Sequence, residues 1–204
     1  MFKTATPLLL ALILATPSIA QDAEGETTAD PAEGLSLGTP LDNAEPASIE
    51  DLAPGQPYVR GQSGDWFFRC LKSPEGEVDP CQLYQLLKDS DGNDVAEMSI
   101  FPLPDSGRAA AGATIVAPLE TLLTEQLTLS VDGGSARRYP FTFCNTAGCV
   151  ARVGFTTEDI AGFKRGNEAT LRMVPAAAPD QVVTLTVSLS GFTAGYDDLV
   201  KIPE

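Results

Sequence analysis

The residue types most able to do chemistry in this chain are four cysteines, and the closest pair lies in the stretch FCNTAGCV, residues 143 to 150. Cysteine pairs can bind zinc, carry a redox couple or form a disulfide. A structural zinc site usually takes four Cys or His ligands in close-set pairs. The chain has no histidine, and ten residues separate Cys70 from Cys81 while four separate Cys144 from Cys149, so we expect no metal site.

The spacing also disfavours a redox role for the cysteines. A thioredoxin-like couple normally has two intervening residues and a first thiol at a helix N-terminus, which lowers its pKa. Instead, Cys144 ends one β-like run and Cys149 begins another, across the turn-forming sequence NTAG. We therefore expect two disulfides, Cys144 to Cys149 and Cys70 to Cys81, each worth roughly 2 to 3 kcal/mol, although four cysteines allow three pairings.

Other catalytic patterns are incomplete. Ser63 in GQSGD approaches the nucleophile elbow of hydrolases, but Asp65 occupies the position of its second glycine. The absence of histidine excludes Ser-His-Asp and Cys-His arrangements. Paired carboxylates, as in glycoside hydrolysis, remain an alternative because acids are plentiful. No particular pair stands out, so we expect a protein that is not an enzyme, with no catalytic residues and no cofactor.

The run DSDGND resembles the start of a calcium loop, with Asp89, Asp91 and Asn93 at alternating positions. It departs from an EF-hand at Asp94, where the loop needs glycine, and at Ile100, where it needs a bidentate glutamate. The Asp-Gly pair is typical of a hairpin turn, which is the structure we expect.

Two groups of residues are candidates for a contact surface. Trp66, Phe67 and Phe68 are consecutive, so a strand would point Phe67 opposite to its neighbours. Core packing explains such aromatics, and a carbohydrate or protein contact through Trp66 is the alternative. Arg137 and Arg138 stand out against the acidic background, and they either meet an acidic partner or protect an edge strand.

Short runs with partial period-two alternation predict about nine strands, with turn residues between them. The expected strands are residues 64–70, 81–87, 94–103, 111–118, 126–131, 138–144, 149–155, 168–174 and 181–189. Capping patterns indicate a helix over 156–166 and a short terminal helix over 190–200. We expect an all-β fold, an antiparallel β-sandwich or a partly closed barrel, with one or two short helices and two disulfides.

The first twenty residues have the pattern of a secretory signal peptide. Lys3 precedes an apolar run, and small residues occupy positions 18 and 20, where a signal peptidase reads. No later segment supplies the roughly 20 apolar residues of a membrane span. We therefore expect a periplasmic or secreted protein whose mature chain has no transmembrane segment.

Residues 21–57 form an acidic stretch that we expect to be a disordered linker, followed by one β domain over 58–204. The chain carries a net charge of −15, and removal of Lys3 with the signal peptide would make it −16. Such a charge repels phosphate groups, which excludes nucleic acid as an expected partner.

Four ordered motifs span roughly residues 61 to 200. They are GDWFFRC followed by CQLYQ, VAPLETLL followed by LSVDGG, FTFCNTAGCVARV, and VSLSGFTAGYDDL. Together they resemble the invasion-associated locus B family of exported alphaproteobacterial proteins. The chain departs from the family pattern in its long acidic leader before Gly61 and in LETLLTEQ, where the family often has a glycine and a proline.

The resemblance implies a periplasmic or surface-associated protein, with a link to host-cell entry in some family members. It brings no accepted active site, so it implies no catalytic residues. We therefore expect a non-enzymatic envelope protein that acts through surface contacts with an envelope protein or glycan. The alternatives are a periplasmic hydrolase that uses carboxylates, and a factor in envelope stress or integrity.

Overall fold

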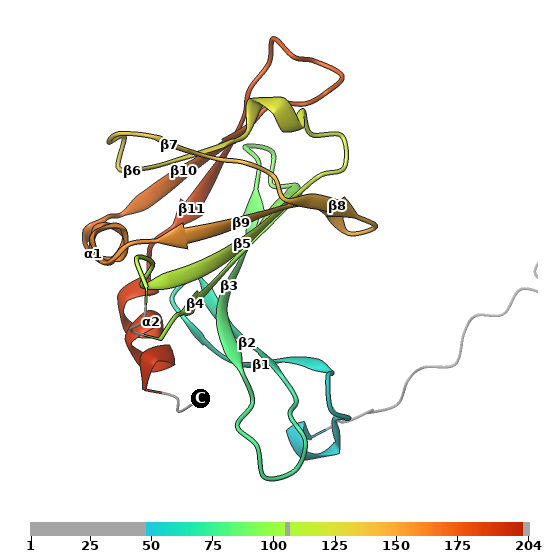
Figure 1. Ribbon diagram of the computed structural model, residues 1–204, viewed down its shortest axis with the longest axis vertical. Helices are drawn as coiled ribbons and strands as arrows, with labels where there is room; N and C mark the ends of the chain where they lie inside the picture. The colour runs from blue at the N-terminus through green and yellow to red at the C-terminus, as the bar shows by residue number, and fades with distance from the viewer. Residues whose placement is uncertain (1–47, 105–106, 202–204) are drawn as a thin grey trace, which may run out of the picture. The chain divides into compact units, whose positions relative to one another are not determined.

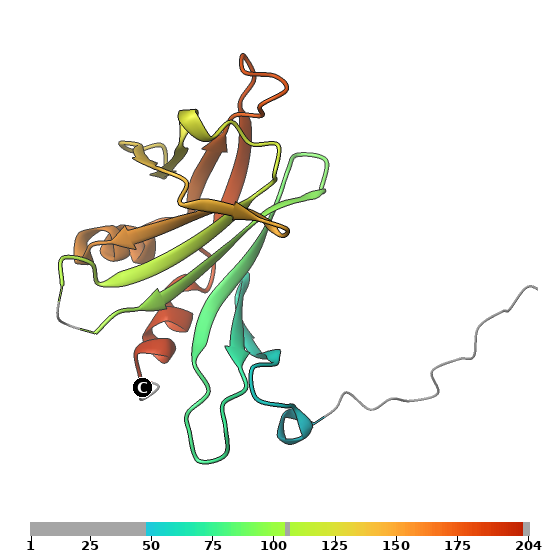
Figure 2. The same ribbon diagram turned by 45° about the vertical axis from the view of Figure 1, so that its right-hand side comes forward.

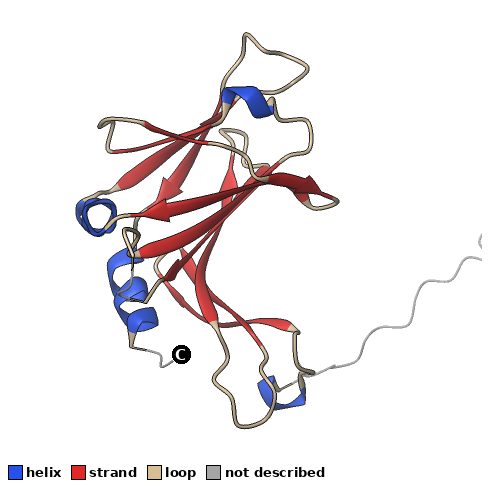
Figure 3. Cartoon of the chain, viewed as in Figure 1, coloured by secondary structure: helices blue, strands red, loops and turns tan. Residues whose placement is uncertain are grey.

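The computed structural model describes residues 48–104 and 107–201 (Figure 1). The predicted signal peptide and residues 21–47 of the predicted linker lie outside the described residues. Within the described part, two antiparallel sheets contain eleven strands, accompanied by two α-helices and two short 3-10 helices (Figure 3). The all-β prediction is confirmed, and the sheets form a sandwich rather than a closed barrel.

The larger sheet has seven strands in the order β1-β2-β3-β4-β5-β9-β8. Their bounds are β1 (Pro57–Ser63), β2 (Trp66–Leu71), β3 (Cys81–Lys88), β4 (Asp94–Pro102), β5 (Ala111–Ala117), β9 (Gly148–Phe155) and β8 (Phe143–Asn145). The smaller sheet has the order β11-β10-β6-β7. Its strands are β11 (Val183–Ser188), β10 (Glu168–Met173), β6 (Leu127–Val131) and β7 (Arg137–Tyr139).

In the described part of the chain, one face of the seven-stranded sheet is covered and the other is open. The helices α1 (Thr157–Arg165) and α2 (Phe192–Val200) and the smaller sheet lie on the same side of it (Figures 1 and 2). The covered face carries the core, whose largest fully buried side chains are Trp66, Phe155, Phe192, Leu83, Leu87, Met98, Ile100, Ile115, Leu127, Leu171, Leu185 and Val187. The alternation of buried and exposed residues along the strands produces these two faces.

The sequence placed most strands correctly, with two exceptions. The expected strand 138–144 is divided at Pro140, so that β7 pairs in the smaller sheet and β8 in the larger one. Proline has no amide hydrogen to donate to a ladder, and the chain uses it to change sheets. Strand β1 was not predicted, because a register shift between Val59 and Gly61 breaks its alternation.

Both predicted helices are present. Thr156 caps α1 by accepting a hydrogen bond from the Asp159 amide, and Asp159 reciprocates in a capping box. At the start of α2, Gly191 has a φ of +79° and its backbone packs against Ser63, where a β-carbon would lie 2.2 Å from the carbonyl oxygen. Glycine is a weak helix former, but at position 191 the positive φ and the close contact with Ser63 require it.

The two predicted disulfides are present, Cys70–Cys81 and Cys144–Cys149. The first joins directly paired residues of β2 and β3, and the second joins paired residues of the β8–β9 hairpin. Among the described residues, no helix is long and apolar enough to cross a membrane.

Candidate functional site

The segment that precedes β2 and the turn between β11 and α2 form one structural clasp. The Trp66 indole donates a 2.8 Å hydrogen bond to the carbonyl oxygen of Ser188, and the Ser188 hydroxyl donates a 2.6 Å bond to the carboxylate of Asp65. Asp65 also donates its amide to the carbonyl of Ser190 at 3.1 Å. We call these contacts, together with Gln85, the clasp.

Gln85 is the buried polar centre of the clasp. Its side-chain amide donates to the carbonyl oxygens of Asp65 at 3.2 Å and Ser188 at 3.1 Å, and its carbonyl accepts from the Ser188 amide at 2.8 Å. The side chain is 6% exposed, so these groups would be costly to leave without partners. Gln85 therefore holds two segments that are more than a hundred residues apart in sequence.

Trp66 does not lie on a contact surface, and that candidate was wrong. Its side chain is 0% exposed and packs edge-on against Phe192, with ring centroids 5.5 Å apart. Phe192 in turn contacts Phe163, which contacts Phe155, in an aromatic chain through the core. The core interpretation of the aromatic run is confirmed: Phe68 is buried beside Trp66, and Phe67 points to the opposite face.

The two arginines of the predicted basic cluster lie on opposite faces of β7. Arg137 donates a 3.0 Å hydrogen bond to Asp159 of α1, so its charge is used within the fold. Arg138 is paired across the sheet with Thr128 and is exposed. The structure therefore does not bring Arg137 and Arg138 together as one contact site.

The open face of the seven-stranded sheet carries a row of side chains in direct register. Pairing across β2, β3, β4, β5 and β9 aligns Phe67, Tyr84, Ser99, Thr114 and Arg152. Cross-strand neighbours on one face lie about 4.5 to 5.5 Å apart at the β-carbon. The row thus combines aromatic, hydroxyl and guanidinium groups along one line across the sheet. We call the whole sheet face that carries this row the open face.

Two arginine–aromatic pairs lie on the open face. The Arg69 guanidinium lies 4.8 Å from the ring centroid of Tyr84, and Arg152 lies 5.5 Å from that of Phe143. Glu97 accepts a 3.0 Å hydrogen bond from the Tyr84 hydroxyl and lies 3.8 Å from Arg69. Burial, followed by the hydrogen bond to Glu97, raises the pKa of Tyr84, so this phenol stays a neutral donor.

A groove of about 950 Å³ follows the open face at the end where β2, β3 and β4 meet the loop 72–80. Its lining residues are Gly55, Pro57, Arg69, Cys70, Leu71, Ser73, Glu77, Val78, Asp79, Pro80, Cys81, Gln82, Glu97, Ser99, Phe101, Pro102, Thr114 and Leu199. Its volume is at the upper end of the range for small-molecule sites. The groove can therefore hold a segment of several residues or sugar units.

A second hollow of about 530 Å³ lies beside the groove and shares Phe101 and Thr114 with it. Gly112 makes this hollow possible, because a β-carbon there would lie 2.5 Å from the Phe101 ring. The aromatic ring lies over the glycine, and Phe101 lines both depressions. Arg152 lines the second hollow.

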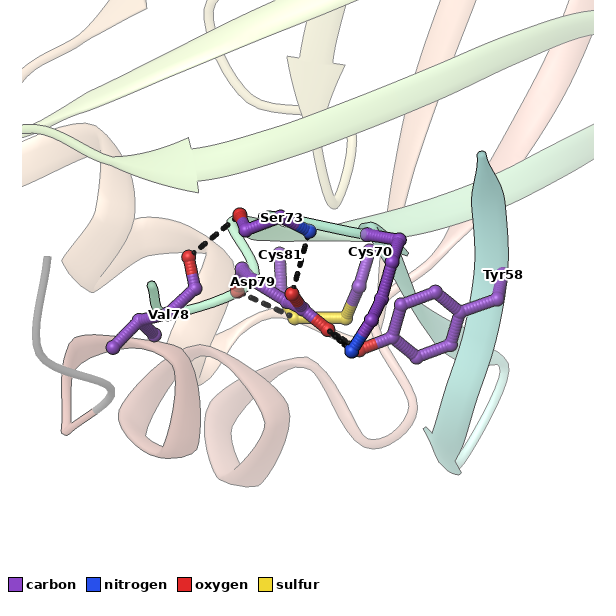
Figure 4. The surroundings of a disulfide bond; sticks show 7 residues. Tyr58, Cys70, Ser73, Val78, Asp79 and Cys81 are labelled. Atoms are coloured by element: carbon purple, nitrogen blue, oxygen red, sulfur yellow. Dashed lines mark hydrogen bonds and ion pairs between the residues drawn. A yellow bond between two sulfur atoms is a disulfide. The ribbon is translucent and has the colours of Figure 1, made fainter. Parts of the chain in front are cut away.

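The loop 72–80 forms one wall of the groove and is fixed around Asp79 (Figure 4). The Asp79 carboxylate accepts a 2.6 Å hydrogen bond from the Tyr58 hydroxyl and a 2.7 Å bond from the Ser73 amide. The Cys70–Cys81 disulfide closes the base of the same loop. The disulfide therefore shapes the groove as well as joining two strands.

The Tyr58 hydrogen bond, followed by that from Ser73, lowers the pKa of Asp79. Burial, followed by the Asp79 hydrogen bond, raises the pKa of Tyr58 to about 12. A general acid in hydrolysis needs a raised carboxyl pKa. Among the described residues, the carboxyl groups with a resolved shift are Asp79 and Asp89, and both pKa values are lowered.

The DSDGND run closes the β3–β4 hairpin, as predicted. Asp89 accepts hydrogen bonds from the amides of Asp91 and Asn93, both at 2.9 Å, and from the Asn93 side chain. Its oxygens are therefore engaged by the turn itself. In the described ranges, no group of three or more His, Cys, Asp or Glu side chains is placed to hold a metal ion.

A family model of the invasion associated locus B (IalB) protein matches residues 66–200. This chain belongs to the invasion associated locus B family. The Invasion protein B homologs of two Brucella abortus strains are each 29% identical over 83 residues, which is 41% of this chain and 47% of theirs. The chain thus spans about half the length of the curated relatives it matches.

The fold of this IalB family member is similar to the crystal structure of invasion associated protein b from Bartonella henselae. The TM-score is 0.57 at 23% sequence identity, and the match covers 71% of this chain and 95% of the other. The first and last family motifs, GDW and SLSGF, meet in the clasp. The two motifs, which are distant in sequence, therefore pack together in the fold.

Sequence reasoning missed the open face. The signal was present in the alternation of β3 and β4, where Gln82 and Tyr84 on β3 and Glu97 and Ser99 on β4 occupy every second position. Their grouping depends on cross-strand register, which the alternation of one strand does not reveal.

Proposed function

We propose that this IalB family member is an exported envelope protein that acts by binding, and that the groove on its open face holds an extended segment of protein or glycan. The signal-peptide pattern of residues 1–20 supports export. The observation that carries the binding proposal is the pair of arginine–aromatic contacts, Arg69 with Tyr84 and Arg152 with Phe143. Both lie on a sheet face that no other layer of residues 48–104 and 107–201 covers.

The chemistry of the groove suits an extended polar chain. Gln82, Ser99 and Thr114 supply amide and hydroxyl groups along its floor. Phe67 and Phe143, which are 36% and 42% exposed, supply apolar surface on the same sheet face. Aromatic and arginine side chains are enriched where protein surfaces bind partners, because they bury large area and donate several hydrogen bonds.

The same groove gives little support to the alternative of a carboxylate-based hydrolase. Glu97 lies in it, but the carboxylate is already engaged by Tyr84 and Arg69. Asp79, an acid in the loop wall of the groove, has a lowered pKa and is held by the Tyr58 hydroxyl. A pair of acids with one raised pKa is the arrangement that a hydrolase would require.

Capture from envelope fractions tests the proposal. The wild-type chain is compared with a variant carrying Arg69→Ala and Arg152→Ala, and with a control carrying Arg60→Ala and Arg165→Ala, which removes the same charge. We expect a partner that is captured by the wild type and the control and lost by the groove variant. Protease or glycosidase treatment of the fraction then identifies the partner as protein or glycan.

Two results would overturn the proposal. One is equal capture by the groove variant and the control, which would indicate a general charge effect. The other is hydrolysis of envelope glycans by the purified wild-type chain that Glu97→Gln abolishes, which would favour the enzyme. Circular dichroism of each variant confirms that it is folded.

A further inference from the structure

The outer face of the smaller sheet carries a second row of side chains in register. Across β7, β6, β10 and β11 the pairing aligns Arg138, Thr128, Arg172 and Thr184. The alternate residues of these strands, among them Leu129 and Leu171, Leu127 and Leu185, are buried in the core. The arginine row therefore faces away from the core, and it lies on a different sheet from the groove.

Neither arginine of this row is used within the fold. In the part of the chain that the structure describes, no ion pair or side-chain hydrogen bond joins Arg138 or Arg172 to another residue. Arg137, the sequence neighbour of Arg138, is bound to Asp159. Two unpaired guanidinium groups on one face are notable in a chain of net charge −15, where acidic partners are abundant.

The two arginines line a cleft of about 420 Å³ at the end of the smaller sheet. The other lining residues are Glu125, Gln126, Thr128, Ala136, Met173, Val174 and Val182. Arg138 on β7 and Arg172 on β10 both pair with Thr128, because β6 lies between these two strands. Neighbouring strands lie about 4.8 Å apart, so the two long side chains can converge on one group above Thr128. The volume is within the range of small-molecule sites, so the cleft has room for a molecule larger than a single charged group.

Gln126 adds a second feature to the cleft. It follows the 3-10 helix η2 (Leu123–Glu125) with a φ of 58° and a ψ of 164°, a backbone region that is essentially restricted to glycine. Such conformations are unfavourable for a residue with a side chain, and they concentrate at ligand-binding sites. The conformation places a side-chain amide, another donor and acceptor, in the lining of the cleft.

We propose that this cleft binds a sugar phosphate, with Arg138 and Arg172 holding the phosphate from both sides. A guanidinium group donates two parallel hydrogen bonds to a phosphate, and a phosphate has three terminal oxygens, enough to share between two arginines. A carboxylate has only two oxygens, so a phosphate offers more acceptors to a pair of arginines. Thr128, Gln126 and Glu125 offer polar groups to sugar hydroxyls, and Val174 and Val182 offer an apolar wall to the sugar ring.

Nuclear magnetic resonance titration of the full chain tests this site with three probes: glucose-1-phosphate, inorganic phosphate and glucose. We expect glucose-1-phosphate to shift the amide signals of Thr128, Arg138 and Arg172 saturably, inorganic phosphate to shift the same signals with weaker affinity, and glucose to leave them unchanged. Arg138→Gln and Arg172→Gln should each weaken glucose-1-phosphate binding about tenfold or more, because each removes a charge-assisted contact.

Arg165→Gln is the matched control, since it removes the same charge from an arginine outside the cleft. It should change the affinity less than about twofold, because distant exposed charges are screened. Arg138→Lys keeps the charge and should bind with intermediate affinity, because it loses the bidentate geometry.

Three outcomes would overturn the proposal. The first is the absence of any shift at the three cleft residues. The second is equal binding of glucose-1-phosphate and inorganic phosphate, which would show that the sugar is not recognised. The third is an equal loss for Arg165→Gln and Arg138→Gln, which would reduce the effect to net charge.

Discussion

The clasp makes a quantitative prediction for Gln85→Leu. The substitution removes three hydrogen bonds, two that Gln85 donates and one that it accepts from the Ser188 amide. The carbonyl of Ser188 keeps its bond from the Trp66 indole, so the groups left without this partner are the Ser188 amide and the Asp65 carbonyl. Ser188 is half-buried and Asp65 is exposed, so each group should cost about 1 to 2 kcal/mol, the lower part of the range for a buried polar group without a partner. We expect the free energy of unfolding to fall by about 2 to 4 kcal/mol.

The chain contains its own reporter for this measurement. Trp66 is the single tryptophan and is buried in the clasp, so its fluorescence follows urea unfolding. The matched control is Gln82→Leu, the same substitution on the same strand but on the open face, where we expect a change within about 0.5 kcal/mol.

A loss of stability equal in the two variants would refute the reasoning, since it would show that the position on the strand rather than the hydrogen bonds decides the cost. So would a loss below about 1 kcal/mol for Gln85→Leu, because it would mean that the clasp groups find other partners.

Three further predictions follow from the same structure. Gly191→Ala should lower the free energy of unfolding by more than Gly55→Ala does. Both glycines have a positive φ, which costs an alanine about 1 to 2 kcal/mol, but only at Gly191 would the new β-carbon lie 2.2 Å from a backbone oxygen. Equal urea midpoints for the two variants would contradict this. Because the pKa of Asp79 is lowered in the folded state, its contribution to stability should be present above about pH 4 and lost as the pH falls through the folded pKa. The difference in unfolding free energy between wild type and Asp79→Asn should therefore shrink in acid. A difference that is constant with pH would argue against this. Replacing both Cys144 and Cys149 by serine should cost about 2 kcal/mol of unfolding free energy, measured in urea, and an unchanged midpoint would show that the hairpin needs no disulfide.

Much of the fold could be predicted because it depends on local patterns. The alternation of apolar and polar residues predicted most strands, and the Asp-Gly pair predicted the β3–β4 hairpin. The capping pattern at Thr156 predicted α1. The disulfide pairing followed from the same logic, since each cysteine lies at the end of an expected strand. The division at Pro140 was missed because one continuous β-like run feeds two different sheets.

The functional surfaces were harder to predict because they depend on which face is covered. Alternation placed Phe67 opposite to Trp66 and Phe68 but did not reveal which face the helices and the smaller sheet would cover. Trp66 was therefore a candidate for the surface although it is buried in the clasp. The open face and the pairing of Arg138 with Thr128 and of Thr128 with Arg172 come from register between strands distant in sequence. Sequence order does not give that register.

Photo-crosslinking in intact cells tests most directly the claim that the open face is the binding surface. A photoreactive amino acid replaces Thr114, on the floor of the groove, or Thr186, on the outer face of the smaller sheet and outside its cleft. The proposed function predicts a discrete crosslinked partner from position 114 that is lost with Arg69→Ala and Arg152→Ala, and none from position 186. Equal crosslinking from the two positions, or none from position 114, would contradict it.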